Sequence, residues 1–231
     1  MVIGVIMSYG YKNNQEKVDV VFDFETVPLP VTQEEIEEYL RELKMGNAKK
    51  PETVARKKAE AEQDAIQKCL DAKRFCVWGA RVISAAFGVV SGQQVSQVES
   101  CFSDDETEIA AFAYNYLKEI GSYRLVGYNI KNFDLPHFAR ILSKANLRLA
   151  QRPGKWDIID MCDYPFGRLK GATCKRVAAA YGITPKVRDM NGSHVEQAYA
   201  NGDFEMIRKY NESDVHLEGE LLGALTTIYS F

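Results

Sequence analysis

The stretch VVFDFET, residues 20–26, decides the fold expected of this chain, because it continues an apolar run typical of a strand covered on both faces of its sheet. Residues two positions apart on a strand point to one face, so Asp23 and Glu25 project together. Phe22 and Phe24 then pack on the opposite side. Two carboxylates this close repel each other unless a cation lies between them, and hard oxygen ligands suit Mg²⁺ or Mn²⁺. The stretch therefore predicts a buried strand that carries a metal site.

The composition indicates a chain with one sizeable hydrophobic core. With 231 residues, 46% of them hydrophobic and 26% charged, it is long enough for a single α/β domain, with or without an insertion. The 29 basic and 32 acidic residues nearly cancel, so any basic surface for nucleic acid must be local. Five cysteines without a CxxC pair indicate neither a disulfide framework nor a zinc site. No apolar stretch approaches the length of a membrane span, so we expect a cytoplasmic protein with no membrane partner.

The order of the predicted elements indicates an α/β fold, with a mixed β-sheet flanked by helices. We expect residues 1–15 to be an N-terminal lead-in and residues 16–231 to be a single domain, interrupted by a charged helical insertion at about 32–74. Outside the insertion, strands are predicted at 17–25, 78–90, 93–99, 124–130 and 156–162, and helices at 104–121, 135–147, 172–183, 193–202 and 203–229.

Three further side chains stand in settings like those of the first two acids. Asp134 lies in GYNIKNFDLPHF, where a predicted strand gives way to a helix, and Asp214 lies in YNESD on the last predicted helix. Tyr210, four residues before Asp214, shares its helix face. A DxE pair alone is a weak motif, but four acids from three segments can converge on one metal site. A second acidic group, for which capping and turn roles are predicted, comprises Asp157, Asp160 and Asp163.

Three motifs, DFET, GYNxxxFD and YxxxD in that order, resemble those of the DEDD superfamily of 3′–5′ exonucleases, which implies an RNase H-like fold. Tyr210 is similar to the tyrosine of the DEDDy subgroup. Residues 186–221 further resemble the C-terminal part of predicted bacterial and phage exonucleases related to the proofreading domain of family-B DNA polymerases. The likeness spans about residues 18–229 apart from the insertion, and it implies a bacterial or phage-infected cell as the setting.

The resemblance implies a role for each residue of the motifs. Asp23 would bridge two divalent ions, Mg²⁺ or Mn²⁺. Glu25 and Asp214 would complete the ligands of the first ion, and Asp134 would hold the second. Tyr210 would orient the attacking water, because a phenol with a pKa of about 10 is a poor base at neutral pH.

Substrate contacts are predicted from the same resemblance and from local charge. Thr26, Asn129 and Phe133 would lie near the substrate, and for Phe133 base stacking and core packing both stay open. Residues 140–188 carry eight more basic than acidic residues, and residues 44–58 carry five more. Either segment can follow a phosphate backbone or form a solvated helix face.

Three functions are compatible with these features. The motifs predict a metal-dependent 3′–5′ exonuclease that degrades nucleic acid, preferably single-stranded DNA, to nucleoside monophosphates by a two-metal-ion mechanism. An exoribonuclease that trims RNA 3′ ends is the second, since DEDD folds serve both polymers. A catalytically inactive module that binds nucleic acid or docks a partner is the third, disfavoured because all four acids and Tyr210 are present. A replication or repair protein is a candidate partner, and the oligomeric state stays open.

Overall fold

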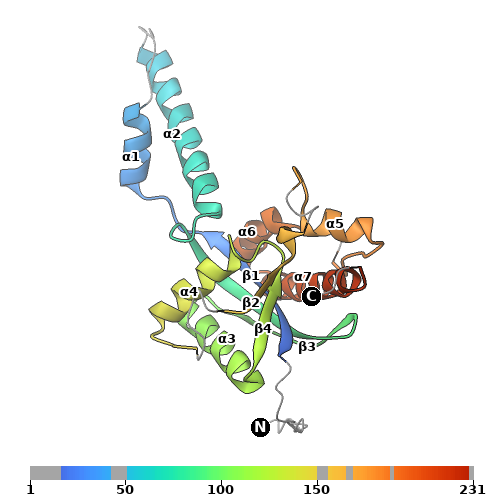
Figure 1. The fold of residues 1–231 in the computed structure, drawn as a ribbon. Helices are drawn as coiled ribbons and strands as arrows, with labels where there is room; N and C mark the ends of the chain where they lie inside the picture. The colour runs from blue at the N-terminus through green and yellow to red at the C-terminus, as the bar shows by residue number, and fades with distance from the viewer. Residues whose placement is uncertain (1–16, 43–50, 150–155, 165–168, 188–189, 229–231) are drawn as a thin grey trace.

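The computed structural model describes residues 17–42, 51–149, 156–164, 169–187 and 190–228, and the predicted lead-in 1–15 lies outside them. Within this part of the chain a five-stranded sheet has the order β3-β2-β1-β4-β5 (Figure 1). The strands are β1 (Val18–Pro28), β2 (Ala80–Ser91), β3 (Gln94–Phe102), β4 (Tyr123–Gly127) and β5 (Ile158–Asp160).

The central strand of the sheet is β1, which pairs antiparallel with β2 and parallel with β4. The outer pairs follow the same division, with β3 antiparallel to β2 and β5 parallel to β4. The register shifts between Glu25 and Thr26, which leaves Ile83 of β2 without a partner in β1 and forms a bulge in β2 opposite the motif. Bulges of this kind re-aim side chains and are frequent beside functional sites.

Helices cover both faces of the sheet (Figure 1). Phe22 and Phe24 pack on one face with α3 and α4, while Val21 packs on the other face with α7. Each large apolar side chain buried in this way stabilises the fold by roughly 1.5–3 kcal/mol. The predicted mixed sheet flanked by helices is thus confirmed. The helices are α1 (Gln33–Glu42), α2 (Pro51–Arg74), α3 (Glu106–Ile120), α4 (Asp134–Lys144), α5 (Cys174–Ala180), α6 (Gly192–Asn201) and α7 (Phe204–Thr226).

Two strands end elsewhere than predicted. The strand expected at 124–130 stops at Gly127, because Asn129 adopts a positive φ of 65° and turns the chain. Asp160 stabilises this turn by accepting hydrogen bonds from the backbone N–H groups of Asn129 (2.8 Å) and Lys131 (3.0 Å). Its carboxylate also caps the short 3₁₀ turn that follows β5, so the capping role predicted for Asp160 is confirmed. β1 continues past its predicted end because β2 remains paired with it as far as Pro28.

Glu106 connects α3, α4 and β2 at one buried point. Its side chain accepts a hydrogen bond from the backbone N–H of Val82 (2.9 Å) and pairs with Arg140 (2.5 Å) and Lys144 (3.0 Å). Burial opposes ionisation of this carboxyl, but the hydrogen bonds from Arg140, Val82 and Lys144 outweigh it and lower its pKa to about 2. Two basic residues of the segment 140–188 are therefore engaged by a buried carboxylate, although the Lys144 side chain is itself largely exposed.

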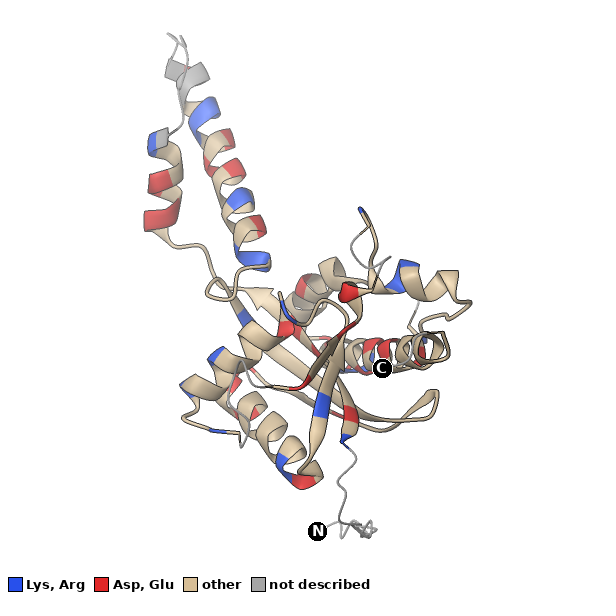
Figure 2. Ribbon diagram, in the orientation of Figure 1, with Lys and Arg blue, Asp and Glu red and all other residues tan. Residues whose placement is uncertain are grey.

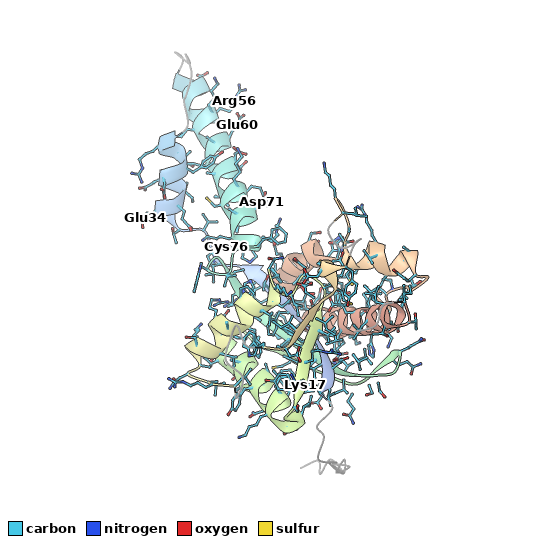
Figure 3. The ribbon with its side chains drawn as sticks, in the orientation of Figure 1. Lys17, Glu34, Arg56, Glu60, Asp71 and Cys76 are labelled. Carbon is cyan, nitrogen blue, oxygen red and sulfur yellow. The ribbon has the colours of Figure 1, made fainter. Side chains whose placement is uncertain are left out.

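The helices α1 and α2 form a hairpin that projects from the body of the molecule (Figure 1). Figure 2 shows both signs of charge along α1 and α2, and Figure 3 shows Arg56, Glu60 and Asp71 on the side of α2 that faces away from α1. At the base, Arg74 pairs with Glu196 of α6. The basic segment predicted at 44–58 falls partly outside the described residues, so its phosphate-binding role stays a prediction.

The turn after α2 carries two exposed aromatic side chains, Phe75 at 75% and Trp78 at 78% exposure. Trp156 is by contrast 9% exposed and stacks on Phe138. The turn lies next to the end of β1, since the backbone N–H of Leu29 donates to the carbonyl of Gly79. In the described part of the chain, no helix combines the length and apolar character needed to cross a membrane.

Candidate active site

β1 and α7 bring three of the predicted acids together. Asp23 and Glu25 project from one face of β1, and Asp214 faces them from α7, which packs on this strand. One carboxylate oxygen from each of the three lies within 4.8 Å of the others. Glu25 is 9% exposed, and Asp23 and Asp214 are half-buried. The three carboxylates form a compact group that is largely buried.

Asp134, the fourth predicted acid, begins α4 and lies beside the same strand. Its Oδ1 accepts a hydrogen bond from the backbone N–H of Phe24 (3.1 Å), midway between Asp23 and Glu25. Because the side chain is 2% exposed, burial raises the pKa of Asp134 to about 8. The turn that begins at Asn129, held by Asp160, therefore delivers Asp134 to the other acids.

The electrostatics of the group favour a bound cation. Burial raises the pKa of Asp23, and the neighbouring charges of Glu25 and Asp134 raise it further. Burial likewise raises the pKa of Glu25, followed by the charges of Asp214 and Asp134. Among the described residues, the buried Oδ1 of Asp214 accepts no hydrogen bond. A group of mutually repelling carboxylates, one of whose buried oxygens accepts no hydrogen bond, fits a hard divalent cation.

Tyr210 lies one turn before Asp214 on α7, and both side chains line a pocket of about 300 Å³. The side chain is 4% exposed, and its pKa is raised by burial and then by the charges of Asp214 and Glu25. A phenol in this setting keeps its proton at neutral pH and is a hydrogen-bond donor rather than a base.

Two residues that sequence reasoning missed contact these groups. Lys175, on α5, donates from Nζ to the Tyr210 hydroxyl (2.9 Å) and lies 3.6 Å from Asp214 Oδ1. Asn211, fully buried beside Tyr210, donates from Nδ2 to Asp23 Oδ2 (2.6 Å) and accepts from Ser84 (3.0 Å). The sequence signal for Asn211 was its place next to the YxxxD tyrosine. Lys175 lies in the basic segment 140–188, for which the sequence predicted only phosphate contact or a solvated helix face.

The three predicted substrate residues lie on β1 and in the turn between β4 and α4. Thr26 is half-buried on β1, directly after Glu25. Asn129 is exposed in the turn after β4. Phe133, which precedes Asp134, is half-buried and packs edge-on against His137 with ring centroids 4.9 Å apart. The ring of Phe133 is therefore partly packed and partly open to solvent.

Comparison with solved structures identifies proteins of similar fold. The family B DNA polymerase of the archaeon Pyrobaculum calidifontis superposes with a TM-score of 0.54 and 16% identity, over 96% of this chain and 25% of the polymerase. Escherichia coli exonuclease I, in complex with a dA13 oligonucleotide, gives a TM-score of 0.47 and 11% identity, over 92% of this chain and 41% of the enzyme. The chain thus spans less than half of either protein.

Comparison with curated protein sequences gave no match. A family model does match, and it covers residues 77–225, which is more than half of the chain. That span includes Asp134, Tyr210 and Asp214, whereas Asp23 and Glu25 on β1 precede it. The chain belongs to the RNase H superfamily.

Proposed function

We propose that the chain is a metal-dependent 3′–5′ exonuclease that releases nucleoside monophosphates, with single-stranded DNA as its preferred substrate. The observation that carries the proposal is the convergence of four buried or half-buried acids, one of which, Asp214, lines a pocket together with Tyr210. The direction of cleavage follows from the likeness of the three motifs to DEDD exonucleases. The similarity of the fold to that of a family B DNA polymerase supports a nucleic-acid substrate.

The acids of the site would hold two Mg²⁺ or Mn²⁺ ions, with Asp23, Glu25 and Asp214 as ligands of one and Asp134 with Asp23 at the other. Such ions supply a water of lowered pKa and neutralise charge on the scissile phosphate. Asn211 fixes the Asp23 carboxylate through the 2.6 Å hydrogen bond, so that ligand does not have to be ordered when a cation binds.

Tyr210 and Lys175 would act on the water and the phosphate. Lys175 donates to the Tyr210 oxygen and the phenol proton is directed to Asp214, so both partners fix the hydroxyl that would orient the attacking water. The charge of Lys175, 3.6 Å from Asp214, adds a positive group to the place where the phosphate gains charge. Thr26, Asn129 and Phe133 would bind the terminal nucleotides, and Phe133 presents a partly open ring for stacking.

The proposal is tested by incubating 5′-labelled DNA and RNA oligonucleotides with the protein and Mg²⁺ or Mn²⁺. We expect a ladder of shortened 5′-labelled products from single-stranded DNA, which EDTA abolishes and Asp23→Ala does not produce. Shortening of RNA alone would instead assign the exoribonuclease function. The absence of metal-dependent products, or wild-type rates with Asp23→Ala, would overturn the nuclease proposal and favour a binding module.

Asn211→Ala is expected to lower both stability and activity. The variant leaves Ser84 and Asp23 without their buried partner, which costs about 1–3 kcal/mol of unfolding free energy. Loss of the fixed Asp23 carboxylate should also reduce kcat by about tenfold or more. Urea unfolding and initial rates on a single-stranded oligonucleotide measure the two effects. Asn115→Ala, exposed on α3, is the control. If Asn211→Ala and Asn115→Ala have the same kcat, Asn211 does not position Asp23.

Lys175→Met is expected to reduce kcat by about 10²-fold, because it removes the donor to Tyr210 and the positive charge beside Asp214. Mn²⁺ affinity should not fall, since the lysine competes with a cation for the same carboxylates. Single-turnover rates and calorimetry separate the two quantities. Lys118→Met on α3 is the matched control. A weaker Mn²⁺ affinity with unchanged kcat would contradict a role of Lys175 in the chemical step.

A further inference from the structure

A fifth acid, Glu218, lies on α7 one turn beyond Asp214 and matches none of the three motifs. The side chain is 5% exposed, and it lines the same pocket as Lys175, Tyr210 and Asp214. Carboxylates are almost never this buried unless they are paired or bound to a metal. Glu218 therefore requires an explanation within the site.

The pairing of Glu218 is incomplete. One oxygen faces the backbone N–H of Tyr128, whereas Oε2 is buried and has no hydrogen-bond partner among the described residues. In the same part of the chain, no Lys or Arg forms a salt bridge with this side chain. A buried oxygen without a partner is costly, so the site is expected to provide one when it is loaded.

Glu218 Oε2 lies beside Gly127 at the end of β4, the strand that precedes the turn to Asp134. A Cβ at Gly127 would lie 3.1 Å from Oε2, so the absence of a side chain there leaves room for the carboxylate over the end of β4. Burial raises the pKa of Glu218, and the next largest contributions come from the charges of Asp134 and Asp214. The negative charges of Asp134 and Asp214 therefore act on the Glu218 carboxylate. The charge of Glu218 in turn raises the pKa of Asp23.

We infer that Glu218 is a fifth carboxylate of the metal site and helps to hold the divalent cation on the side of Asp134. The inference rests on the proposed metal-dependent function, and it adds a residue that no motif predicted. Asp134 supplies one oxygen to the backbone of Phe24, so a cation held near it has fewer carboxylate oxygens available from that residue. The unpaired Oε2 of Glu218 compensates for this loss.

A purely structural role makes a different prediction. A neutral, protonated Glu218 would only fill space and accept from Tyr128, and glutamine does both equally well. Glu218→Gln therefore separates the two roles, because it keeps size and the acceptor and removes the charge that attracts a cation. Glu220→Gln, two residues further along α7 and half-buried, removes the same charge outside the pocket and is the matched control.

The test titrates Mn²⁺ into the metal-free protein by calorimetry and follows Mn²⁺-dependent thermal stabilisation. We expect the wild-type chain and Glu220→Gln to bind alike, and Glu218→Gln to lose about tenfold or more in affinity at one site with a smaller rise in Tm. Glu218→Asp, which keeps the charge on a shorter stem, should bind more tightly than the glutamine variant. If Glu218→Gln does not fold, a weakened Mn²⁺ affinity of Glu218→Asp relative to wild type supports the inference, and an unchanged one overturns it.

The outcomes separate this inference from the proposed function. Wild-type Mn²⁺ affinity in Glu218→Gln would overturn the role of Glu218 and leave the exonuclease proposal intact. Weakened binding in Glu218→Gln, together with a wild-type protein that degrades no nucleic acid, would support the role of Glu218 and overturn the exonuclease proposal. No Mn²⁺ binding by the wild-type chain would overturn both.

Discussion

Asp214→Asn is expected to release nucleotides about 10³-fold more slowly than the wild-type chain, which corresponds to roughly 4 kcal/mol of lost transition-state stabilisation. Asp214 contacts several groups of the site. Its carboxylate completes the group with Asp23 and Glu25, lies 3.6 Å from Lys175, and adds to the charge around Tyr210. Asparagine keeps the shape of the side chain and removes the charge that a divalent ion requires.

The measurement is the initial rate at which a 5′-labelled single strand is shortened, with Mg²⁺ and with Mn²⁺. Because Asp214→Asn also removes one repelling charge from a buried acidic group, its metal-free stability should equal or exceed that of the wild type. Asp203→Asn, an exposed aspartate at the start of the same helix that makes no side-chain capping hydrogen bond, is the control. A folded Asp214→Asn that retains more than a tenth of the activity would contradict its place as a metal ligand.

Glu106→Ala is expected to produce the largest loss of stability, about 3–5 kcal/mol of unfolding free energy. The substitution leaves Arg140 and Lys144 without their shared partner and the Val82 N–H without an acceptor, at the point where α3, α4 and β2 meet. Arg140 is 15% exposed, so an uncompensated charge remains largely buried. Chemical unfolding at neutral pH gives the difference directly.

The pH dependence of the Glu106 contribution has a definite sign. The folded-state pKa of about 2 lies below the unfolded value of 4.5, so the contribution is complete above about pH 4.5 and is lost as pH falls toward 2. The gap in stability between wild type and Glu106→Gln should narrow over this range. Glu119→Ala, exposed on the same helix, should change stability by less than about 0.5 kcal/mol at any pH. A gap that stays constant with pH would contradict the lowered pKa.

The local pattern of the sequence predicted the parts of the site that sit on regular elements. The alternation in VVFDFET placed its phenylalanines and acids on opposite faces of β1, and a helix face joined Tyr210 to Asp214. The mixed sheet followed from the order of strands and helices. In each case the prediction used the spacing of residues within one short segment. That spacing fixes which face of a strand or helix each side chain occupies.

The remaining parts of the site depend on contacts between distant segments, which periodicity does not encode. Asn211 meets Asp23 across 188 residues of sequence, and Lys175 reaches Tyr210 across 35. In the sequence, Glu218 is one more charged residue on a long helix. Its burial depends on the absence of a side chain at Gly127, a residue of a distant strand. The early end of β4 was likewise missed, since it depends on a carboxylate from β5 that holds the turn at Asn129.

The two tryptophans differ in solvent exposure, so intrinsic fluorescence can distinguish their surroundings. Trp78 is open to water beside the end of β1, whereas Trp156 is enclosed, so an aqueous quencher such as iodide extinguishes the emission of the first before it reaches the second. The quenchable fraction of the fluorescence therefore reports on one place, the base of the helical hairpin. Shielding of that fraction by an oligonucleotide or by another protein would identify which of them covers Phe75 and Trp78.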